Sequence, residues 1–313
     1  MKYDDKNIKI AVIEGLKKNY SIIPALTEFI PVGEESYTYS VTSSNKSKYF
    51  VKYCEKKSII KNIDSVNKLL TELHNFNFVV PPIISNEETT FKLIKGNIYV
   101  YPYIEGEIIT VGNEEIEKEV VNQLLEIVVQ IHTFKNKMGL NLPVENLKNN
   151  FLNDFNKIWE IFINNKNNIS VDVVSLLISS EKLVRTLINE QTETGDFYTK
   201  NKPNLVLTHG DITGRNIIRA TSGLKLVDWD GAMFAPAERD LNFLIDNPNF
   251  SLNEYLGKVK VESYDPKLKK YYSLQWAIKS ILDNFEKLMT LNLTDSDRKE
   301  YIDEAKEYLG YYQ

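Results

Sequence analysis

Three side chains in the stretch Thr208–Leu241 have types and a spacing that suit phosphoryl transfer. Asp211 and Asn216 form a D-x-x-x-x-N pattern, and Asp228 follows twelve residues after Asn216. In such a reaction one carboxylate orients and deprotonates the attacking hydroxyl, while a carboxamide and a second carboxylate hold Mg²⁺ on the nucleotide phosphates. Mg²⁺ prefers oxygen ligands, which these side chains supply. The pattern predicts Asp211 as the general base and Asn216 and Asp228 as the metal ligands.

The residues between Asn216 and Asp228 predict the element that brings these two side chains together. An apolar run, Asn-Ile-Ile, breaks at Ala-Thr-Ser-Gly and resumes at Leu224 as Leu-Lys-Leu-Val. Two short apolar runs separated by small and polar residues predict a hairpin, here with its turn at Gly223. Such a hairpin returns Asp228 to the neighbourhood of Asn216, and so predicts a compact site for the cation.

The motifs around these residues resemble those of one enzyme family. His209-Gly210-Asp211, Asn216 and Asp228-Trp229-Asp230 match, in order, the motifs of the aminoglycoside phosphotransferase family, small-molecule kinases with a protein-kinase-like fold. The stretch Asp230–Leu241 is similar to the spectinomycin phosphotransferase branch in particular. Protein kinases carry H-R-D, D-F-G and A-P-E motifs, and none of the three occurs in this sequence. We call residues 209–216 the catalytic loop and residues 227–231 the metal loop.

The resemblance implies an α+β, protein-kinase-like fold with two lobes. A small antiparallel sheet lobe, residues 1–104, would bind the nucleotide, and a larger, mainly helical lobe, residues 105–313, would carry catalysis and bind the substrate. At the hinge, the Pro102 carbonyl would accept a hydrogen bond from the adenine amino group, and the Ile104 amide would donate one to the ring. An ordinary connection between a strand and a helix is the alternative for this segment.

The first lobe contains a candidate lysine and a candidate turn for the nucleotide phosphates. Phe50, Lys52 and Cys54 alternate onto one strand face, and a lysine among apolar neighbours is costly to bury without an anion. Together with the downstream motif, this pattern favours Lys52 as the partner of the α- and β-phosphates over an exposed lysine on an edge strand. By the same resemblance, the turn around Gly33, with Ser36 just beyond it, would cover the triphosphate.

The acidic partner of Lys52 is harder to predict. Kinase-like folds place an acidic residue on the following helix, here residues 58–76, to orient the lysine. Glu72 is the candidate for that role and Asp64 is the alternative. An exposed position on the helix surface is a third interpretation of either residue.

Other residues receive supporting roles from the resemblance. His209 would brace the metal loop, and Asp240 would accept hydrogen bonds from backbone N–H groups of the catalytic loop. Asp230 would be a second metal contact, a substrate contact or a structural acceptor. His132 lies on an apolar helix face, which is more typical of a core histidine than of a catalytic base.

Acidic and aromatic side chains predict the surface that binds a cationic acceptor. The candidate substrate-binding residues are Asp230, Glu238, Trp276, Asp283 and Glu286. Carboxylates attract a cation, and an aromatic ring face adds to that attraction. The net charge of −5 argues against nucleic acid as the main partner, because binding phosphates needs a basic surface.

Length and composition suit a soluble protein with two lobes. The chain has 313 residues, of which 42% are hydrophobic and 26% are charged. Cys54 is the only cysteine, the N-terminal segment has no apolar signal core, and no run is long enough to span a membrane. These features predict a cytoplasmic protein without a membrane partner, either a monomer or a homodimer.

Together these features predict an enzyme that transfers the γ-phosphoryl group of ATP or GTP, with Mg²⁺, to a hydroxyl of an aminoglycoside or aminocyclitol such as spectinomycin. One alternative is a metabolic kinase for choline, a sugar or an amino alcohol. The other is a non-catalytic structural or binding member of the same fold. The combination of Lys52, Asp211, Asn216 and Asp228 weighs against this last alternative.

Overall fold

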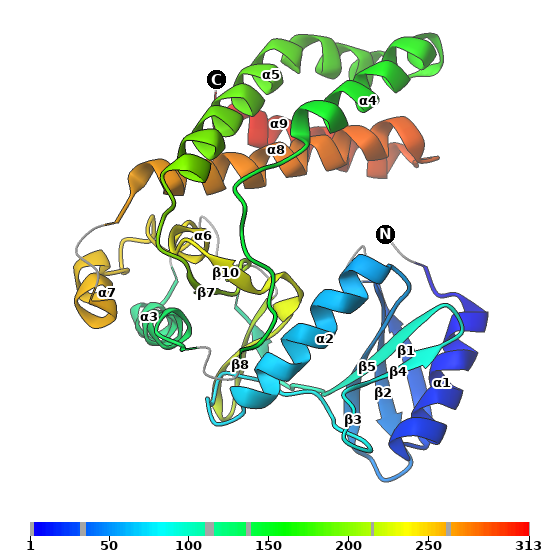
Figure 1. Cartoon of the computed structure of the whole chain (residues 1–313). Coiled ribbons are helices and arrows are strands. Elements are labelled where there is room, and N and C mark those ends of the chain that lie inside the picture. The colour runs from blue at the N-terminus through cyan, green and yellow to red at the C-terminus, as the bar shows by residue number, and fades with distance from the viewer. Residues whose placement is uncertain are drawn as a thin grey trace. The chain divides into compact units, whose positions relative to one another are not determined.

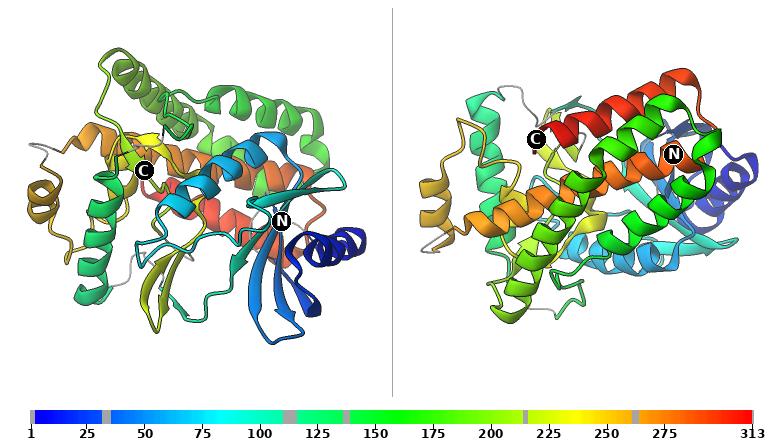
Figure 2. Two further views of the ribbon diagram at one scale, coloured as in Figure 1. Left: turned by 60° about the horizontal axis from the view of Figure 1, so that its bottom comes forward. Right: turned by 90° about the horizontal axis from the view of Figure 1, so that it is seen from above.

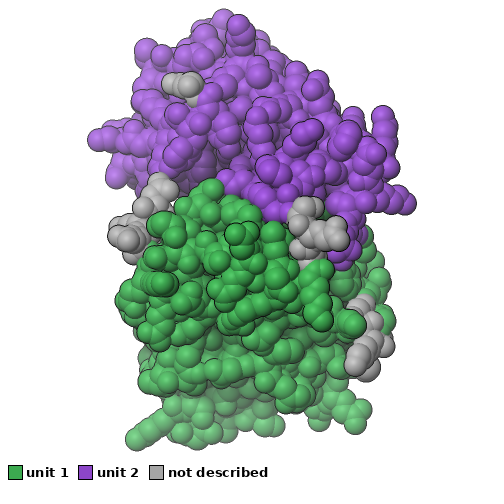
Figure 3. Space-filling view, turned by 90° about the vertical axis from the view of Figure 1, so that its left-hand side faces the viewer, with its two compact units in different colours: residues 1–144, 206–260 green, residues 145–205, 261–313 purple. Residues whose placement is uncertain are grey.

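The computed structural model describes residues 3–31, 36–109, 116–135, 139–213, 216–260 and 264–312 (Figure 1, Figure 2). The chain divides into two compact units, which Figure 3 colours separately: unit 1 comprises residues 1–144 and 206–260, and unit 2 comprises residues 145–205 and 261–313. Unit 1 contains an N-terminal antiparallel sheet and unit 2 is helical, which confirms the predicted mixed fold. The predicted lobe boundary near residue 105 does not coincide with this division, and it stays a prediction.

A five-stranded antiparallel sheet with two flanking helices forms the N-terminal part of unit 1. Its strand order is β1-β2-β3-β5-β4, so β3 is central and pairs with both β2 and β5. These elements are α1 (Lys6–Tyr20), β1 (Pro24–Ile30), β2 (Ser36–Ser43), β3 (Lys48–Cys54), α2 (Lys57–Glu72), β4 (Thr90–Leu93) and β5 (Gly96–Pro102).

Alternation along β3 divides its side chains between two apolar layers. Val51 and Tyr53 pack in one layer with residues of α1, whereas Cys54 packs in the other with residues of α2. Figure 1 shows these two helices on opposite sides of the sheet. Lys52 shares the α2 face with Cys54, because residues two apart in a strand point the same way. The inward face predicted for Lys52 is therefore confirmed.

Smaller sheets and short helices complete unit 1. They are β6 (Glu107–Ile108), α3 (Lys118–His132), β7 (Val206–Thr208), β8 (Ile217–Ala220), β9 (Gly223–Leu226), the 3-10 turn η3 (Trp229–Gly231), β10 (Met233–Ala235), α6 (Glu238–Leu241) and α7 (Leu252–Val259). β8 pairs with β6 and β9, and β10 pairs with β7. The Leu226 amide donates to the Phe78 carbonyl at 2.8 Å, which attaches the β8–β9 hairpin to the segment after α2.

Unit 2 is built from helices that share one apolar core. Its described elements are α4 (Phe151–Asn165), the 3-10 turn η1 (Lys166–Asn168), α5 (Val171–Lys200), α8 (Pro266–Thr290) and α9 (Asp295–Gly310). The right-hand view of Figure 2 shows the four α-helices together, and each contributes to the core, for example with Phe155, Leu177, Ile278 and Ala305. In the described ranges of both units, every helix is too short or too polar to cross a membrane.

Candidate active site

The β8–β9 hairpin brings Asn216 and Asp228 together at its open end. The two strands pair along their length, and Gly223 follows the turn with φ +104°, a conformation that favours glycine. Beyond the paired strands, the Val227 amide donates to the Asn216 carbonyl at 2.9 Å. The predicted hairpin is confirmed, and its last hydrogen bond joins one proposed metal ligand to the residue that precedes the other.

The Asn216 side chain also contacts the catalytic loop. Its Nδ2 atom donates to the backbone carbonyl of Asp211 at 3.1 Å, so the amide oxygen is the atom left to bind a cation. The Asp211 carboxylate in turn accepts a hydrogen bond from the Thr213 hydroxyl. Asn216 is thus linked to Asp211 on one side and to the metal loop on the other.

The ammonium group of Lys52 lies between two carboxylates of the metal loop. Its Nζ atom is 2.7 Å from Asp228 Oδ1 and 2.9 Å from Asp230 Oδ2. Lys52 is buried, with 7% of its surface exposed. Burial lowers the pKa of Lys52, but the charges of Asp228 and Asp230 outweigh this effect and leave the pKa above its ordinary value. The lysine is therefore a fixed positive charge at this site.

The pKa values of the two carboxylates are shifted in opposite directions. The charge of Lys52 holds the pKa of Asp228 below its ordinary value, whereas burial raises the pKa of Asp230. Half of the Asp228 side-chain surface is exposed, against 28% for Asp230. Asp228 also has a left-handed backbone, with φ 61° and ψ 58°, which is uncommon outside glycine and clusters at functional sites. Asp228 is therefore the better placed of the two to bind a cation.

Asp240, on α6, holds the backbone of the catalytic loop. Its fully buried carboxylate accepts hydrogen bonds from the amides of His209, at 2.9 Å, and Gly210, at 2.6 Å. Nε2 of His132 donates a third at 3.2 Å, and Nδ1 of that ring accepts from the Tyr255 hydroxyl at 2.6 Å. Burial alone would raise the pKa of Asp240, but the hydrogen bond from His132 and the electrostatic effects of His132, Arg239 and His209 together outweigh it, and the pKa is lowered. The contact expected of Asp240 is present, and His132 is its buried partner.

His209 joins the catalytic loop to the metal loop. Its Nδ1 atom accepts from the Asp211 amide at 3.2 Å, so the ring carries its proton on Nε2 and donates it to the Val227 carbonyl at 3.0 Å. The residue is fully buried, and burial lowers its pKa below the ordinary value, which keeps the ring neutral. These bonds support the bracing role implied for His209, and its contribution to activity stays a prediction.

The catalytic loop contains a close contact that its motif did not predict. Gly210 has φ +90°, and a Cβ atom there would lie 2.0 Å from Nη1 of Arg239. Arg239 Nη1 donates to the Thr208 hydroxyl at 2.9 Å, which holds the guanidinium over Gly210. Only glycine combines this backbone conformation with this space, so the glycine in His209-Gly210-Asp211 was the signal that could have predicted a covering side chain.

Helix α2 does not supply the acidic partner predicted for Lys52. Glu72 is exposed at the last residue of α2, and the two carboxylates that contact Lys52 come from the metal loop. The buried face of α2 runs through Ile63, Asn67 and Leu70, and a residue two positions after Leu70 points away from that face. The assignment of Glu72 as the partner of Lys52 is therefore wrong for this structure.

The residues predicted to cover the triphosphate are only partly described. Gly33 lies outside the described residues. Ser36, the first residue of β2, is buried, and its hydroxyl has no hydrogen-bond partner among the described residues. It pairs across the sheet with Cys54, so it shares the face of Lys52. A phosphate oxygen on that face would supply the missing partner, although the assignment of Ser36 stays a prediction.

The Pro102 carbonyl and the Ile104 amide, predicted to contact adenine, do not take part in pairing with β3. Pro102 is the last residue of β5, and the next amide, that of Tyr103, donates to the Lys48 carbonyl at 3.2 Å. In an extended segment, successive residues direct their polar backbone groups to opposite edges. The Pro102 carbonyl and the Ile104 amide therefore point away from β3, an arrangement compatible with the predicted contacts to adenine.

The residues predicted to bind the acceptor are divided between the two units. Asp230 and Glu238 belong to unit 1, where Glu238 is buried in α6. Trp276, Asp283 and Glu286 lie on α8 in unit 2, and Glu286 is exposed. Their role in binding the acceptor stays a prediction.

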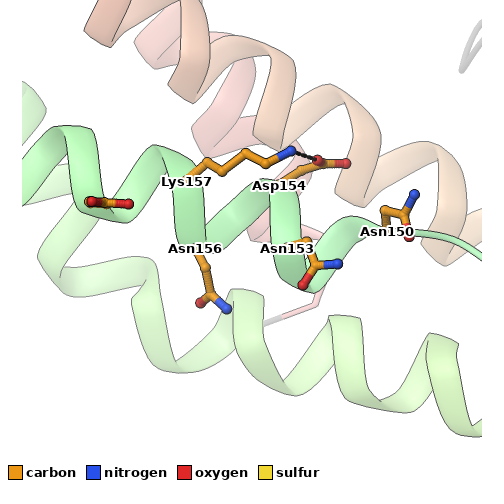
Figure 4. Close-up of a pocket in the computed structure, with 6 residues that line it drawn as sticks. Asn150, Asn153, Asp154, Asn156 and Lys157 are labelled. Carbon is orange, nitrogen blue, oxygen red and sulfur yellow. Dashed lines mark hydrogen bonds and ion pairs between the residues drawn. The ribbon is translucent and has the colours of Figure 1, made fainter.

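A shallow pocket on unit 2 offers a different surface (Figure 4). It is lined by residues of α4 and the residue before it: Asn150, Asn153, Asp154, Asn156, Lys157 and Glu160. Lys157 already pairs with Asp154 at 3.2 Å, and no lining residue belongs to the phosphoryl-transfer set. We therefore place the candidate active site at the hairpin in unit 1.

The donor set at the hairpin suits a hard cation that also has a phosphate ligand. The carboxylates of Asp228 and Asp230 and the amide oxygen of Asn216 are the kind of ligands that Mg²⁺ prefers. Across the described ranges, no three His, Cys, Asp or Glu side chains come together as a metal site. Mg²⁺ sites commonly combine one or two carboxylates with substrate phosphates, so a cation here would depend on a bound nucleotide.

The antiparallel sheet and the helical part that follows it are arranged as in phosphotransferases of the protein-kinase-like fold. Residues 27–272 match the phosphotransferase enzyme family, and the chain belongs to that family. A curated relative, protein StrN of Streptomyces griseus, is 23% identical over 304 residues, which cover 92% of this chain and 87% of the relative.

Two solved structures illustrate the shared fold. A spectinomycin phosphotransferase in complex with ADP and spectinomycin has a TM-score of 0.70 at 20% identity, covering 98% of this chain and 95% of the other. An ethanolamine kinase of Plasmodium vivax has a TM-score of 0.58 at 16% identity, covering 99% and 89%. At these identities the likeness extends to the fold alone.

Proposed function

We propose that the protein transfers the γ-phosphoryl group of ATP or GTP to a hydroxyl of a small cationic molecule, with an aminocyclitol or aminoglycoside such as spectinomycin as the first candidate. The observation that carries the proposal is the placement of Lys52, Asp211, Asn216 and Asp228 in one unit. Lys52 pairs with Asp228, Asn216 donates to the Asp211 carbonyl, and the Asn216 carbonyl accepts from the residue before Asp228. Family membership and the likeness to a spectinomycin phosphotransferase support it.

Lys52 is the group that receives the nucleotide phosphates in this proposal. An ammonium group has three donors, of which two are directed to Asp228 and Asp230. The third, together with exchange of a carboxylate for a phosphate oxygen, leaves Lys52 able to bind the triphosphate. Mg²⁺, held by Asn216 and Asp228, would neutralise charge on the transferred phosphoryl group.

Asp211 orients and deprotonates the acceptor hydroxyl. Its Oδ1 atom accepts from Thr213, which leaves Oδ2 for the acceptor. As the acceptor oxygen forms its bond to the γ-phosphorus, the bond to the leaving nucleoside diphosphate breaks and the proton passes to Asp211. His209 and Asp240 keep the loop backbone in place through the bonds described above.

A metabolic kinase for an amino alcohol is the second candidate. The likeness to the ethanolamine kinase favours it, and both candidate acceptors combine a hydroxyl with a positive charge. The net charge of −5 is compatible with either acceptor.

An acceptor panel separates the two candidates. The protein is incubated with Mg²⁺, with ATP or GTP, and with one acceptor in each reaction. The acceptors are spectinomycin, kanamycin, choline and ethanolamine. Release of the nucleoside diphosphate and the mass of the acceptor are measured. The proposal predicts a phosphorylated aminocyclitol or aminoglycoside, and none with Asp211→Asn. Phosphorylation of the amino alcohols alone would select the second candidate, and failure to bind either nucleotide would contradict both.

A further inference from the structure

Helix α2 and strand β5 are joined by a hydrogen bond between two neutral side chains. The Tyr101 hydroxyl donates to Asn67 Oδ1 at 2.7 Å. Asn67 is fully buried, and its Nδ2 group has no hydrogen-bond partner in the described part of the chain. Leaving a buried amide unpaired costs free energy, so such a group in a folded protein needs an explanation.

This pair lies beside the charges proposed to bind the nucleotide. Helix α2 packs against η3, the turn that carries Asp230. Burial raises the pKa of Tyr101, the charges of Asp230 and Asp228 raise it further, and the charge of Lys52 opposes them. Tyr101 pairs across the sheet with Phe50, which points to the same face as Lys52, so the Tyr101 side chain shares the face of Lys52.

Asn67 occupies the buried face of the helix from which kinase-like folds orient their strand lysine. Those folds use an acidic residue there, whereas this chain has a carboxamide, and its acidic Glu72 is exposed. Asp228 and Asp230 already supply Lys52 with two negative partners. A third carboxylate would add repulsion within the cluster and towards the triphosphate. A neutral pair avoids that repulsion.

We propose that Asn67 and Tyr101 form a neutral positioning pair that sets the place of Asp230 and, through it, of Lys52 when Mg-nucleotide binds. This inference rests on the proposed function and identifies the residues that take the place of the acidic helix residue. When Lys52 exchanges a carboxylate for a phosphate oxygen, the carboxylate loses a donor. In this proposal, the unpaired Nδ2 group of Asn67 replaces that donor.

Two substitutions test the pair by titration with Mg-ATP. Asn67→Asp preserves the size of the side chain and the acceptor for Tyr101, but it replaces the Nδ2 donor with a negative charge. Tyr101→Phe removes only the hydroxyl. We expect Asn67→Asp to raise the Kd for Mg-ATP about tenfold, because it removes a proposed donor to a charged partner, the Asp230 carboxylate. Tyr101→Phe should raise it about threefold, and KM for the acceptor should be unchanged in both variants.

Tyr99→Phe is the matched control. Tyr99 lies on the same strand and also contacts α2, donating to the Ile60 carbonyl at 3.5 Å, and burial and the charge of Asp64 raise its pKa. It therefore contacts the N-terminal half of the helix. Tyr99→Phe should change the melting temperature about as much as Tyr101→Phe while leaving the Kd for Mg-ATP unchanged. Equal losses of affinity in these two variants would overturn the proposal, because they would show a general effect of packing.

A double-mutant cycle tests whether the pair acts through Asp230. Tyr101→Phe should weaken Mg-ATP binding much less in an Asp230→Asn background than in the unaltered chain. The Asp230 carboxylate, which the Tyr101 hydroxyl is proposed to position, is already replaced in that background. Additive effects, or an unchanged Kd in Asn67→Asp, would overturn the inference. A lack of Mg-ATP binding by the unaltered chain would instead contradict the proposed function, so the two failures are distinguishable.

Discussion

The catalytic loop and the proposed nucleotide-binding face, which comprises Ser36 and Lys52 of the sheet and Asn67 of α2, are both in unit 1 and are stabilised by different kinds of contact. At the loop, the Asp240 carboxylate of α6 accepts hydrogen bonds from the His209 and Gly210 amides and a third from His132, and both ring nitrogens of His209 are bonded. On the nucleotide-binding face, the Ser36 hydroxyl and the Asn67 Nδ2 group are buried without partners among the described residues. Lys52 there depends on two carboxylates from a distant part of the chain.

This difference indicates how the two regions take part in the reaction. Fully paired buried groups restrict a segment to one geometry, so these hydrogen bonds hold His209, Gly210 and Asp211 in place. Unpaired buried groups carry a free-energy cost that a ligand can remove, so under the proposed function the phosphates would complete the nucleotide-binding face. Substitutions in the loop should therefore affect stability and turnover, and substitutions on the face should affect nucleotide affinity.

Removal of the Asp240 carboxylate should have the largest effect. Asp240→Ala leaves two amides and the His132 ring without their buried acceptor, so we expect a loss of about 3–5 kcal/mol in the free energy of unfolding. Denaturant unfolding measures it. Asp240→Asn, which keeps one acceptor oxygen, should lose less. A stability unchanged in Asp240→Ala would show that these bonds do not hold the loop.

Substitution of the proposed base should act on turnover and leave the fold intact. Asp211→Asn preserves the shape of the side chain but cannot take a proton, so kcat should fall at least ~10²-fold with the Kd for Mg-ATP little changed. Steady-state kinetics on the accepted hydroxyl compound, with nucleotide titration beside them, measure both quantities. Activity that survives in Asp211→Asn would show that another group serves as the base.

His209 should add a pH dependence to stability. Its pKa is lowered by burial in the folded state, so the unfolded chain takes up the proton first as the pH falls below about 6.5. Stability should then decrease by at most about 1.4 kcal/mol per pH unit from this group. The Asp240 carboxylate has a lowered pKa and stays ionised in this range.

Urea unfolding at a series of pH values from about 8 to about 5 measures this contribution. His209→Gln should flatten the dependence of the unfolding free energy on pH. Equal slopes in the unaltered chain and in His209→Gln would contradict the burial of a neutral ring at this position.

An exposed ion pair on unit 2 should have the smallest effect. Lys157 and Asp154, drawn in Figure 4, are 3.2 Å apart with side chains 73% and 48% exposed. Solvent screens such a pair, so Lys157→Ala should change the unfolding free energy by about 0–0.5 kcal/mol and leave phosphoryl transfer unchanged. A marked loss of activity would indicate that the pocket on α4 takes part in the reaction.

Local patterns predicted those parts of the site that depend on neighbouring residues. The hairpin followed from two apolar runs and the turn before Gly223, and the inward direction of Lys52 followed from alternation in its strand. Asn216 and Asp228 are both attached to that hairpin, so their approach required no knowledge of the rest of the fold.

Contacts between distant segments were not predictable from such patterns. The carboxylate at 2.7 Å from Lys52 lies 176 residues further along the chain, and helical periodicity favoured no single acidic residue on α2. The same limit applied to Arg239 over Gly210 and to His132 beneath Asp240. These contacts depend on how helices pack against loops, and a motif shows only that a residue of the right type is present.

The most direct test of the account is calorimetric titration of Mg-ATP into the unaltered chain and into Asp228→Ala, with Asp211→Asn as the control. We expect the unaltered chain and Asp211→Asn to bind with similar Kd, and Asp228→Ala to bind at least about tenfold more weakly, because it removes a proposed carboxylate ligand of the cation and a partner of Lys52. An unaltered chain that does not bind Mg-ATP, or an Asp228→Ala variant with an unchanged Kd, would contradict it.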